Sequence, residues 1–196
     1  MYPDILALSI FLFVGAFSPG PNNLLASYSG FNFGIKKTLP LIYGVTFGFP
    51  IVLIAVNSGL AIAFNQFPLF QDVLKILGSG FLIYMAYKIA VSSKSEKKEI
   101  KNPAKFFNMI LFQFINPKAV LFAIMVISTF INTNENFLRD TIIVLSVAIT
   151  FSFVSIFSWC LLGKFLRRFA TNKKFVQTFN YVMSFLLIVC VIMFYV

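Results

Sequence analysis

The sequence has little charge, no histidine and only two cysteines. Charged residues make up 11% of its 196 residues, whereas hydrophobic residues make up 59%. An ordinary soluble domain has roughly a quarter of its residues charged. A folded chain of this length with so little charge cannot present a water-compatible surface. Because 27 of the residues are phenylalanine, the composition favours lipid as the solvent and excludes an ordinary soluble domain.

The missing residue types also exclude most catalytic chemistry. Without histidine, and with no carboxylate in the middle of an apolar run, the chain lacks the groups for hydrolysis, metal chemistry or a carboxylate proton relay. Cys160 and Cys190 lie inside apolar runs without metal-ligand spacing, so we predict them to be small buried hydrophobic residues. We therefore expect no enzymatic activity, no cofactor and no metal site.

The net charge of +10 raises the question of nucleic-acid binding. The basic residues, however, fall in short clusters between apolar segments, which is typical of cytoplasmic loops of membrane proteins. We therefore expect membrane lipid as a partner, and no nucleic acid.

Six apolar runs are long enough to cross a bilayer, which takes about 20 helical residues. They are Ile5–Phe31, Leu39–Phe64, Leu69–Ala90, Phe106–Ile131, Thr141–Gly163 and Phe175–Val196. The first run has no preceding Lys or Arg and no small-residue cleavage site, so we interpret it as an uncleaved span rather than a signal peptide. The predicted fold class is all-α: a polytopic membrane protein with six transmembrane helices.

The basic residues predict the orientation of these spans. All except Lys75, Lys118 and Arg139 fall in or beside the loops after the first, third and fifth runs. The positive-inside rule then places these three loops in the cytoplasm and both termini outside. Three spans precede the central linker and three follow it, so we predict two inverted repeats, residues 1–91 and 105–196, joined by a cytoplasmic linker at 92–104.

The first span of each half carries a break. One lies at Ser18-Pro19-Gly20-Pro21-Asn22-Asn23 and the other at Phe114-Ile115-Asn116-Pro117-Lys118. A helix cannot continue through such proline and glycine positions. In a bilayer, irregular backbone is tolerated only where it packs against protein or lines a wet cavity. Paired broken helices are typical of the substrate sites of transporters built from inverted repeats.

The polar residues at the breaks suit a small zwitterion. Lys118 or a half-helix N-terminus can bind a carboxylate, and amides or freed carbonyls can bind an ammonium group. The predicted substrate-binding residues are Pro19, Gly20, Pro21, Asn22, Asn23, Gln113, Asn116, Pro117 and Lys118. Two alternatives stay open: the prolines are plain kinks, or the Lys118 side chain extends to the cytoplasmic headgroups.

Several of these motifs together resemble one family. They are Phe17-Ser18-Pro19-Gly20-Pro21-Asn22-Asn23-Leu24-Leu25, then Gly34, a glycine-rich second span, and Phe114-Ile115-Asn116-Pro117-Lys118. Over nearly the whole chain, they resemble the LysE/RhtB family of bacterial amino-acid exporters. Further segments are most similar to its cysteine and O-acetylserine branch, namely Gln113-Phe114-Ile115-Asn116, Ser128-Thr129-Phe130, Asn180 and Cys190.

The resemblance implies efflux of a small amino acid or derivative, such as cysteine, O-acetylserine, threonine or homoserine, across the bacterial inner membrane. It also implies coupling to the proton-motive force and no cofactor. A proton carrier would then be Lys118, a peripheral acid such as Asp4 or Asp72, or the substrate. A homodimer is compatible with so small a transporter.

Two other classes of function remain as alternatives. One is a passive channel or cation carrier. The other is a transmembrane thiol-disulfide electron carrier, as found in the wider clan of the resembled family, which needs a cysteine in the first span of each half. The chain has Asn22, Asn23, Asn116 and Lys118 at those places, so the residues argue against electron transfer.

Overall fold

The computed structural model describes residues 4–60, 66, 68–92, 103–131, 137–170 and 172–195, which contain helices and no strand. The elements are α1 (Ile5–Phe17), α2 (Pro21–Ala55), the π-helical turn η1 (Val56–Leu60), α4 (Pro68–Ser92), α5 (Phe106–Ile115), α6 (Pro117–Phe130), α7 (Phe137–Leu166), the 3-10 turn η2 (Arg167–Phe169) and α8 (Lys173–Ile192). The predicted all-α class is confirmed.

Long apolar helices dominate the described part of the chain. Four are long and apolar enough to cross a bilayer, at 21–59, 72–91, 137–169 and 173–192, and the bent pair α5 and α6 makes a fifth. Large apolar side chains lie exposed on their outer faces; Ile76 of α4, for example, is 63% exposed. Such surfaces suit lipid rather than water. The chain is therefore a polytopic membrane protein.

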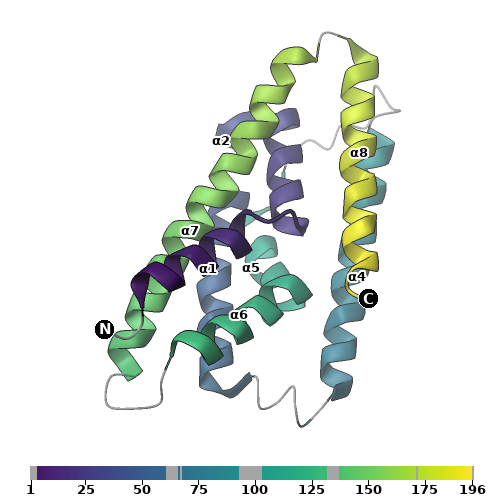
Figure 1. Cartoon of the computed structure of the whole chain (residues 1–196). Coiled ribbons are helices and arrows are strands. Elements are labelled where there is room, and N and C mark those ends of the chain that lie inside the picture. Colours follow the sequence, from purple (N-terminus) through teal and green to yellow (C-terminus); the bar gives the residue numbers. More distant parts are fainter. Residues whose placement is uncertain are drawn as a thin grey trace.

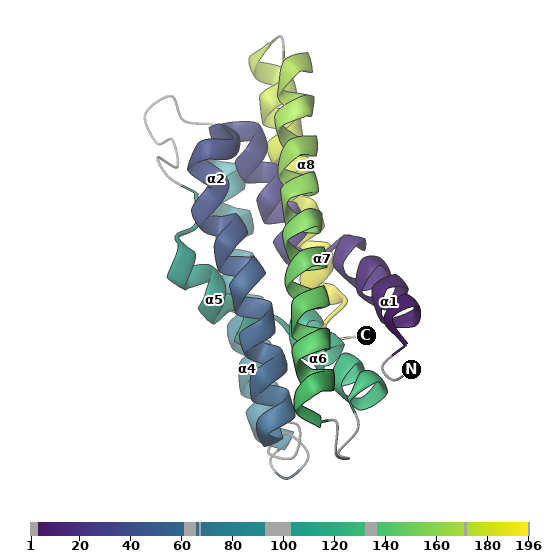
Figure 2. The same ribbon diagram turned by 90° about the vertical axis from the view of Figure 1, so that its left-hand side faces the viewer.

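Helix length alone thus gives five spans rather than the six predicted, because α1 is short and α2 continues through two predicted spans. Gly34 divides α2 with a non-helical backbone at φ 74° and ψ 175°, a positive φ that glycine adopts at little cost. Figures 1 and 2 show α2 reversing direction at this bend. The turn between the first two predicted spans therefore consists of little more than one glycine.

The first break lies between α1 and α2 and comprises Ser18, Pro19 and Gly20. Asp4 begins α1 by accepting hydrogen bonds from the backbone N–H groups of residues 6 and 7. The helix ends at Phe17 because Ser18 precedes a proline, which favours an extended backbone. Pro21 then occupies the first turn of α2, where its missing N–H is not needed. The break is narrower than predicted, since Asn22 and Asn23 are already helical.

The second break, between α5 and α6, is a single residue. Asn116 has an extended backbone at φ −90° and ψ 102°, as expected for a residue before proline. Pro117 opens α6, and the two helices meet at a bend of 69°. The predicted break at residues 114–118 is confirmed as a break but is confined to this one position, so Lys118 lies in the first turn of α6.

The helices begin and end toward two opposite ends of the molecule. In Figures 1 and 2 the bend of α2, the end of α4 and the junction of α7 with α8 lie toward the upper end, whereas α4 and α7 start at the lower end. The segments at the upper end carry Lys36, Lys37, Lys88, Lys164, Arg167, Arg168, Lys173 and Lys174. Residues 93–102 of the predicted linker, with four more lysines, lie outside the described residues.

Small residues bring the backbones of neighbouring helices into contact. A Cβ atom added at Gly30 or Gly163 would collide with the backbone of the facing helix in the α2–α7 pair. Two apolar clusters result, one around the upper parts of α2, α4, α5, α7 and α8, and one around α1, α6 and the lower parts of α2 and α7. Cys160 and Cys190 are buried as free thiols in the upper cluster, as predicted.

Candidate functional site

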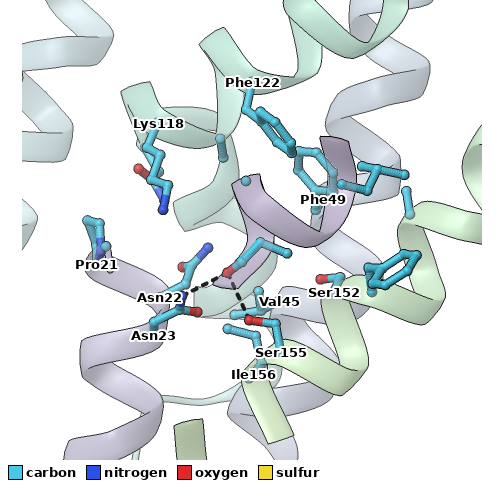
Figure 3. A pocket seen from close by; sticks show the side chains of 18 residues that line it. Pro21, Asn22, Asn23, Val45, Phe49, Lys118, Phe122, Ser152, Ser155 and Ile156 are labelled. Carbon is cyan, nitrogen blue, oxygen red and sulfur yellow. Dashed lines mark hydrogen bonds between the residues drawn. The ribbon is translucent and has the colours of Figure 1, made fainter. Parts of the chain in front are cut away.

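Both breaks border one cavity of about 560 Å³, its open mouth included, enclosed by α1, α2, α6 and α7 (Figure 3). The lining draws on both apolar clusters, so the cavity lies where they meet. Of the predicted site residues, the cavity lining contains Gly20, Pro21, Asn22, Asn23, Asn116 and Lys118.

The Lys118 side chain crosses from α6 to the end of α1. Its Nζ donates to the carbonyl of Ser18 at 2.7 Å, to Ser18 Oγ at 2.8 Å and to the carbonyl of Pro19 at 3.2 Å. The last carbonyls of a helix have no intrahelical partner and carry partial negative charge. Lys118 therefore caps α1, and an extension toward the headgroups is not the arrangement in the structure.

Two further side chains complete this cap. Asn23 Nδ2 donates to the carbonyls of Ala16 and Ser18, at 2.8 and 2.9 Å. Ser155 of α7 donates to the same Ala16 carbonyl at 2.8 Å. Every carbonyl from Ala16 to Pro19 except that of Phe17 thus accepts a hydrogen bond from a side chain beyond the break. Three separate elements, α2, α6 and α7, converge on the end of α1.

Asn22 and Gln113 form a reciprocal amide pair between α2 and α5. Asn22 Nδ2 donates to Gln113 Oε1 at 2.8 Å, and Gln113 Nε2 donates back to Asn22 Oδ1 at 3.2 Å. Gln113 Nε2 also donates to the Met109 carbonyl at 2.8 Å. Gln113 is fully buried and does not line the cavity. It lies behind Asn22 and holds that side chain.

The remaining predicted residues occupy different positions. Pro19 contributes its carbonyl, while Pro117 faces a second cavity on the other side of α6, beside Lys75. Asn116 lines the first cavity and is 1% exposed, and its Oδ1 has no hydrogen-bond partner. The two breaks thus bring polar side chains that are about 95 positions apart in the sequence to one cavity, as Asn22 and Lys118 show.

The cavity also has walls that the sequence reading missed. Ser152 and Ser155 line it from α7, together with the rings of Phe49, Phe122 and Phe151 (Figure 3). Phe122 stacks on Phe11 and Phe49, with centroid distances of 5.2 and 5.9 Å. The sequence contained a pattern that indicates this wall, because spacings of three and four residues put the small side chains at 148, 152 and 155 on one helix face.

The positive charge of Lys118 has no counter-ion among the described residues. Its ammonium contacts neutral oxygens only, and the ion pair found in this part of the chain joins Arg139 to Asp140. The N-termini of α2 and α6 also border the cavity, each with a proline in its first turn and no side-chain cap. Helix N-termini with free N–H groups attract anions. The electrostatics of the cavity therefore favour an anionic group.

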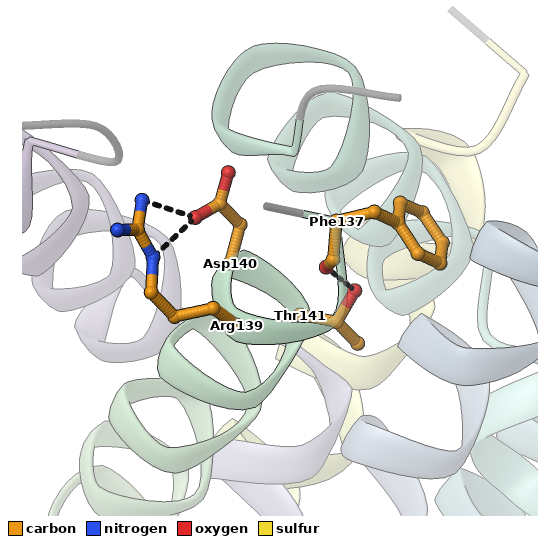
Figure 4. Close-up of polar contacts among 4 residues, drawn as sticks. All are labelled: Phe137, Arg139, Asp140 and Thr141. Carbon is orange, nitrogen blue, oxygen red and sulfur yellow. Dashed lines mark hydrogen bonds and ion pairs between the residues drawn. The ribbon is translucent and has the colours of Figure 1, made fainter. Parts of the chain in front are cut away.

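Asp140 is a buried carboxylate that the sequence reading placed outside the spans. Because α7 begins at Phe137, four residues before the predicted start, Asp140 lies in its first turn and is 1% exposed. Arg139 Nη2 lies 3.1 Å from Asp140 Oδ1, and the Arg139 side chain is half-exposed (Figure 4). Arg139 belongs to the same turn, so this ion pair follows from local sequence once the helix start is known.

A multi-pass helical chain with two broken helices at one cavity has the architecture of a membrane transporter. The family model described as LysE type translocator matches residues 13–196, and the chain belongs to this family. The predicted family is therefore confirmed, and it is a family of translocators.

The chain also matches named relatives over almost its whole length. The chain is 26% identical to the cysteine/O-acetylserine efflux proteins of Salmonella typhi and Escherichia coli strain K12, over 98% of each chain. It is 27% identical to the protein of the same name from Escherichia coli O139:H28, also over 98% of each chain. No solved structure matches the chain.

Proposed function

We propose that the protein is a secondary transporter that exports a small zwitterionic amino acid or derivative across the bacterial inner membrane. The observation that carries the proposal is the Lys118 ammonium, which lies between the two breaks beside the cavity and has no counter-ion among the residues that the structure describes. The proposed site comprises the nine predicted residues. Two of them do not line the cavity: Gln113 holds the Asn22 side chain, and Pro117 begins α6. The names of the relatives support cysteine and O-acetylserine as substrates.

The substrate amino group binds where the Lys118 ammonium now lies. The carbonyls of Ser18 and Pro19 and the Ser18 hydroxyl already hold one alkylammonium group at 2.7–3.2 Å. A substrate ammonium has the same charge and the same three donors as a lysine. Asn116 Oδ1, which is buried and without a partner, supplies a further acceptor in the same cavity.

The substrate carboxylate binds the released Lys118 and the free N–H groups at the N-termini of α2 and α6. Substrate binding is then an exchange of partners: the ammonium of the substrate replaces Lys118 on α1, and its carboxylate takes Lys118 as a new partner. No charge is left buried and unpaired at the end of this exchange, which lowers its free-energy cost.

The proposed topology is the six-span, inverted 3+3 repeat, with units 1–91 and 105–196 and a linker at 92–104. In this reading α1 and the part of α2 before Gly34 form the broken first span, and α5 with α6 forms the broken fourth. The chain reversal at Gly34 and the 69° bend support it. The basic residues at the upper end support a cytoplasmic location for that end and an external location for both termini.

We further propose that export is coupled to the proton-motive force. A homodimer of this chain is the assembly we expect.

Counterflow in proteoliposomes tests the transporter class. We expect labelled O-acetylserine or cysteine to accumulate transiently when the vesicles are preloaded with the unlabelled compound, and an imposed proton gradient to increase the flux. Uptake without trans-stimulation would instead indicate a channel, and loss of flux in a Cys160→Ser, Cys190→Ser variant would indicate electron transfer.

A further inference from the structure

The cavity lining is chemically mixed. Lys118, Asn22 and Asn23 lie at the breaks, and most of the remaining lining is apolar, including Phe49, Phe122, Phe151, Val45 and Ala148. Figure 3 shows Lys118 and Ser152 on opposite sides of the cavity, with the Ser152 hydroxyl directed into it. A zwitterion held at the breaks therefore points its side chain toward the wall that contains Ser152.

The Ser152 hydroxyl is not engaged within the protein. Other hydroxyls of α7 bond to carbonyls: Ser146 donates to residue 142 at 2.7 Å, Thr150 to residue 146 at 2.9 Å, and Ser155 to residue 16. Ser152 makes no hydrogen bond within the described part of the chain, although it is only 7% exposed. Its Oγ opens into the cavity, so an apolar ligand seated there would displace water from the hydroxyl without replacing the lost hydrogen bond, whereas a polar ligand would replace it.

We propose that Ser152 is the specificity-determining residue for the substrate side chain. Its hydroxyl forms a hydrogen bond with a hydroxyl or ester oxygen carried on the substrate Cβ, while the aromatic and aliphatic walls limit the size of that side chain. The site therefore prefers amino acids with a short oxygen-bearing side chain over hydrocarbon isosteres of equal volume. This inference rests on the proposed transport function.

The physical basis is the asymmetry of hydrogen-bond recognition. A site with a polar group rejects a hydrocarbon isostere of its substrate, because the isostere leaves that group unpaired. A purely apolar pocket discriminates poorly between the substrate and its isostere. Without Ser152, the walls around the side chain would be apolar, since Ser155 is already bound to the Ala16 carbonyl. Discrimination between isosteres should thus depend on this one hydroxyl.

Isosteric competition tests the inference. In counterflow of labelled O-acetylserine, we compare serine with 2-aminobutyrate and threonine with valine as inhibitors. Wild-type protein should favour the hydroxylated member of each pair by about tenfold, as one hydrogen bond provides. Ser152→Ala should bring both ratios close to one by improving inhibition by the hydrocarbon, and Ser152→Thr, which keeps the hydroxyl, should retain the preference.

Ser146→Ala is the matched control, because it removes a hydroxyl from the same helix outside the cavity and should leave both ratios unchanged. An unchanged thermal unfolding midpoint in detergent shows that Ser152→Ala is folded. Unchanged ratios in Ser152→Ala, or equal inhibition by both members of each pair in the wild type, would overturn the inference. Absence of any counterflow in the wild type would instead refute the proposed function.

Discussion

The two breaks begin from the same local chemistry and end in opposite roles. At each, a proline forces the preceding residue into extended backbone and then opens the next helix. The first break has its carbonyls bonded by Lys118, Asn23 and Ser155, and so acts as an acceptor. The second break supplies the Lys118 cation and leaves Asn116 Oδ1 without a partner.

The difference between the breaks teaches how two similar backbone interruptions can build an asymmetric site. Both carry a proline and an extended residue before it, but their side chains are complementary rather than equal. One side offers oxygens and the other a cation, which is what a zwitterion with two unlike ends requires. The following predictions test whether this asymmetry carries the function.

The largest expected effect comes from Lys118→Met. This change removes the Lys118 cation from the breaks, leaves the Pro19 carbonyl without this donor, and leaves the Ser18 carbonyl bonded to Asn23 alone among the described residues. Hydrogen bonds to charged groups contribute about 1.5–3 kcal/mol each, so we expect efflux to fall by at least about 100-fold in a counterflow assay. Lys75→Met, which changes a half-buried lysine at the second cavity, is the control and should keep most of the flux. Normal flux from Lys118→Met would refute the exchange of partners.

Matched alanine substitutions of Asn23 and Asn116 should separate structural from functional roles. Asn23→Ala removes two hydrogen bonds to α1 carbonyls, so the free energy of unfolding should fall by about 2 kcal/mol. Asn116→Ala removes an acceptor that has no partner, so stability should change little while the apparent affinity for substrate weakens. Thermal unfolding in detergent, combined with counterflow, measures both. Equal destabilisation by the two variants would contradict the distinction between the breaks.

A smaller effect is expected for the amide pair that links α2 to α5. Asn22→Ala, Gln113→Ala and the double variant form a thermodynamic cycle, and their reciprocal hydrogen bonds should give a coupling free energy of about 1 kcal/mol. Unfolding midpoints of the four proteins in one detergent provide the measurement. Strict additivity would mean that Gln113 does not hold Asn22 in place.

The elements and the breaks could be predicted because their causes are local. Apolar runs of span length, the prolines at 19, 21 and 117, and the clusters of basic residues each act within a few residues of chain. The boundaries were less accurate. The reversal at Gly34 and the early start of α7 at Phe137 depend on how the helices pack, so Asp140 appeared to lie outside the spans although it is buried.

Side-chain partners at the site were harder to predict. Pro117 seemed equivalent to Pro19, yet the rotation of α6 turns it to the second cavity, and Gln113 lies behind Asn22 instead of beside the cavity. Ser152 and Ser155 belong to an apolar run, and two serines on one helix face of such a run only weakly indicate a cavity wall. Their role became visible once α7 was placed against α1.

By itself, the sequence determined that the chain is a helical membrane protein of the LysE type translocator family, with helix breaks before Pro21 and before Pro117. These properties follow from hydropathy and from backbone restrictions at proline and glycine, which neighbouring residues impose. Only the tertiary structure decided that Lys118 caps α1, a contact between residues 100 positions apart. Contacts of that kind depend on the rotation and crossing of whole helices, which no local pattern specifies.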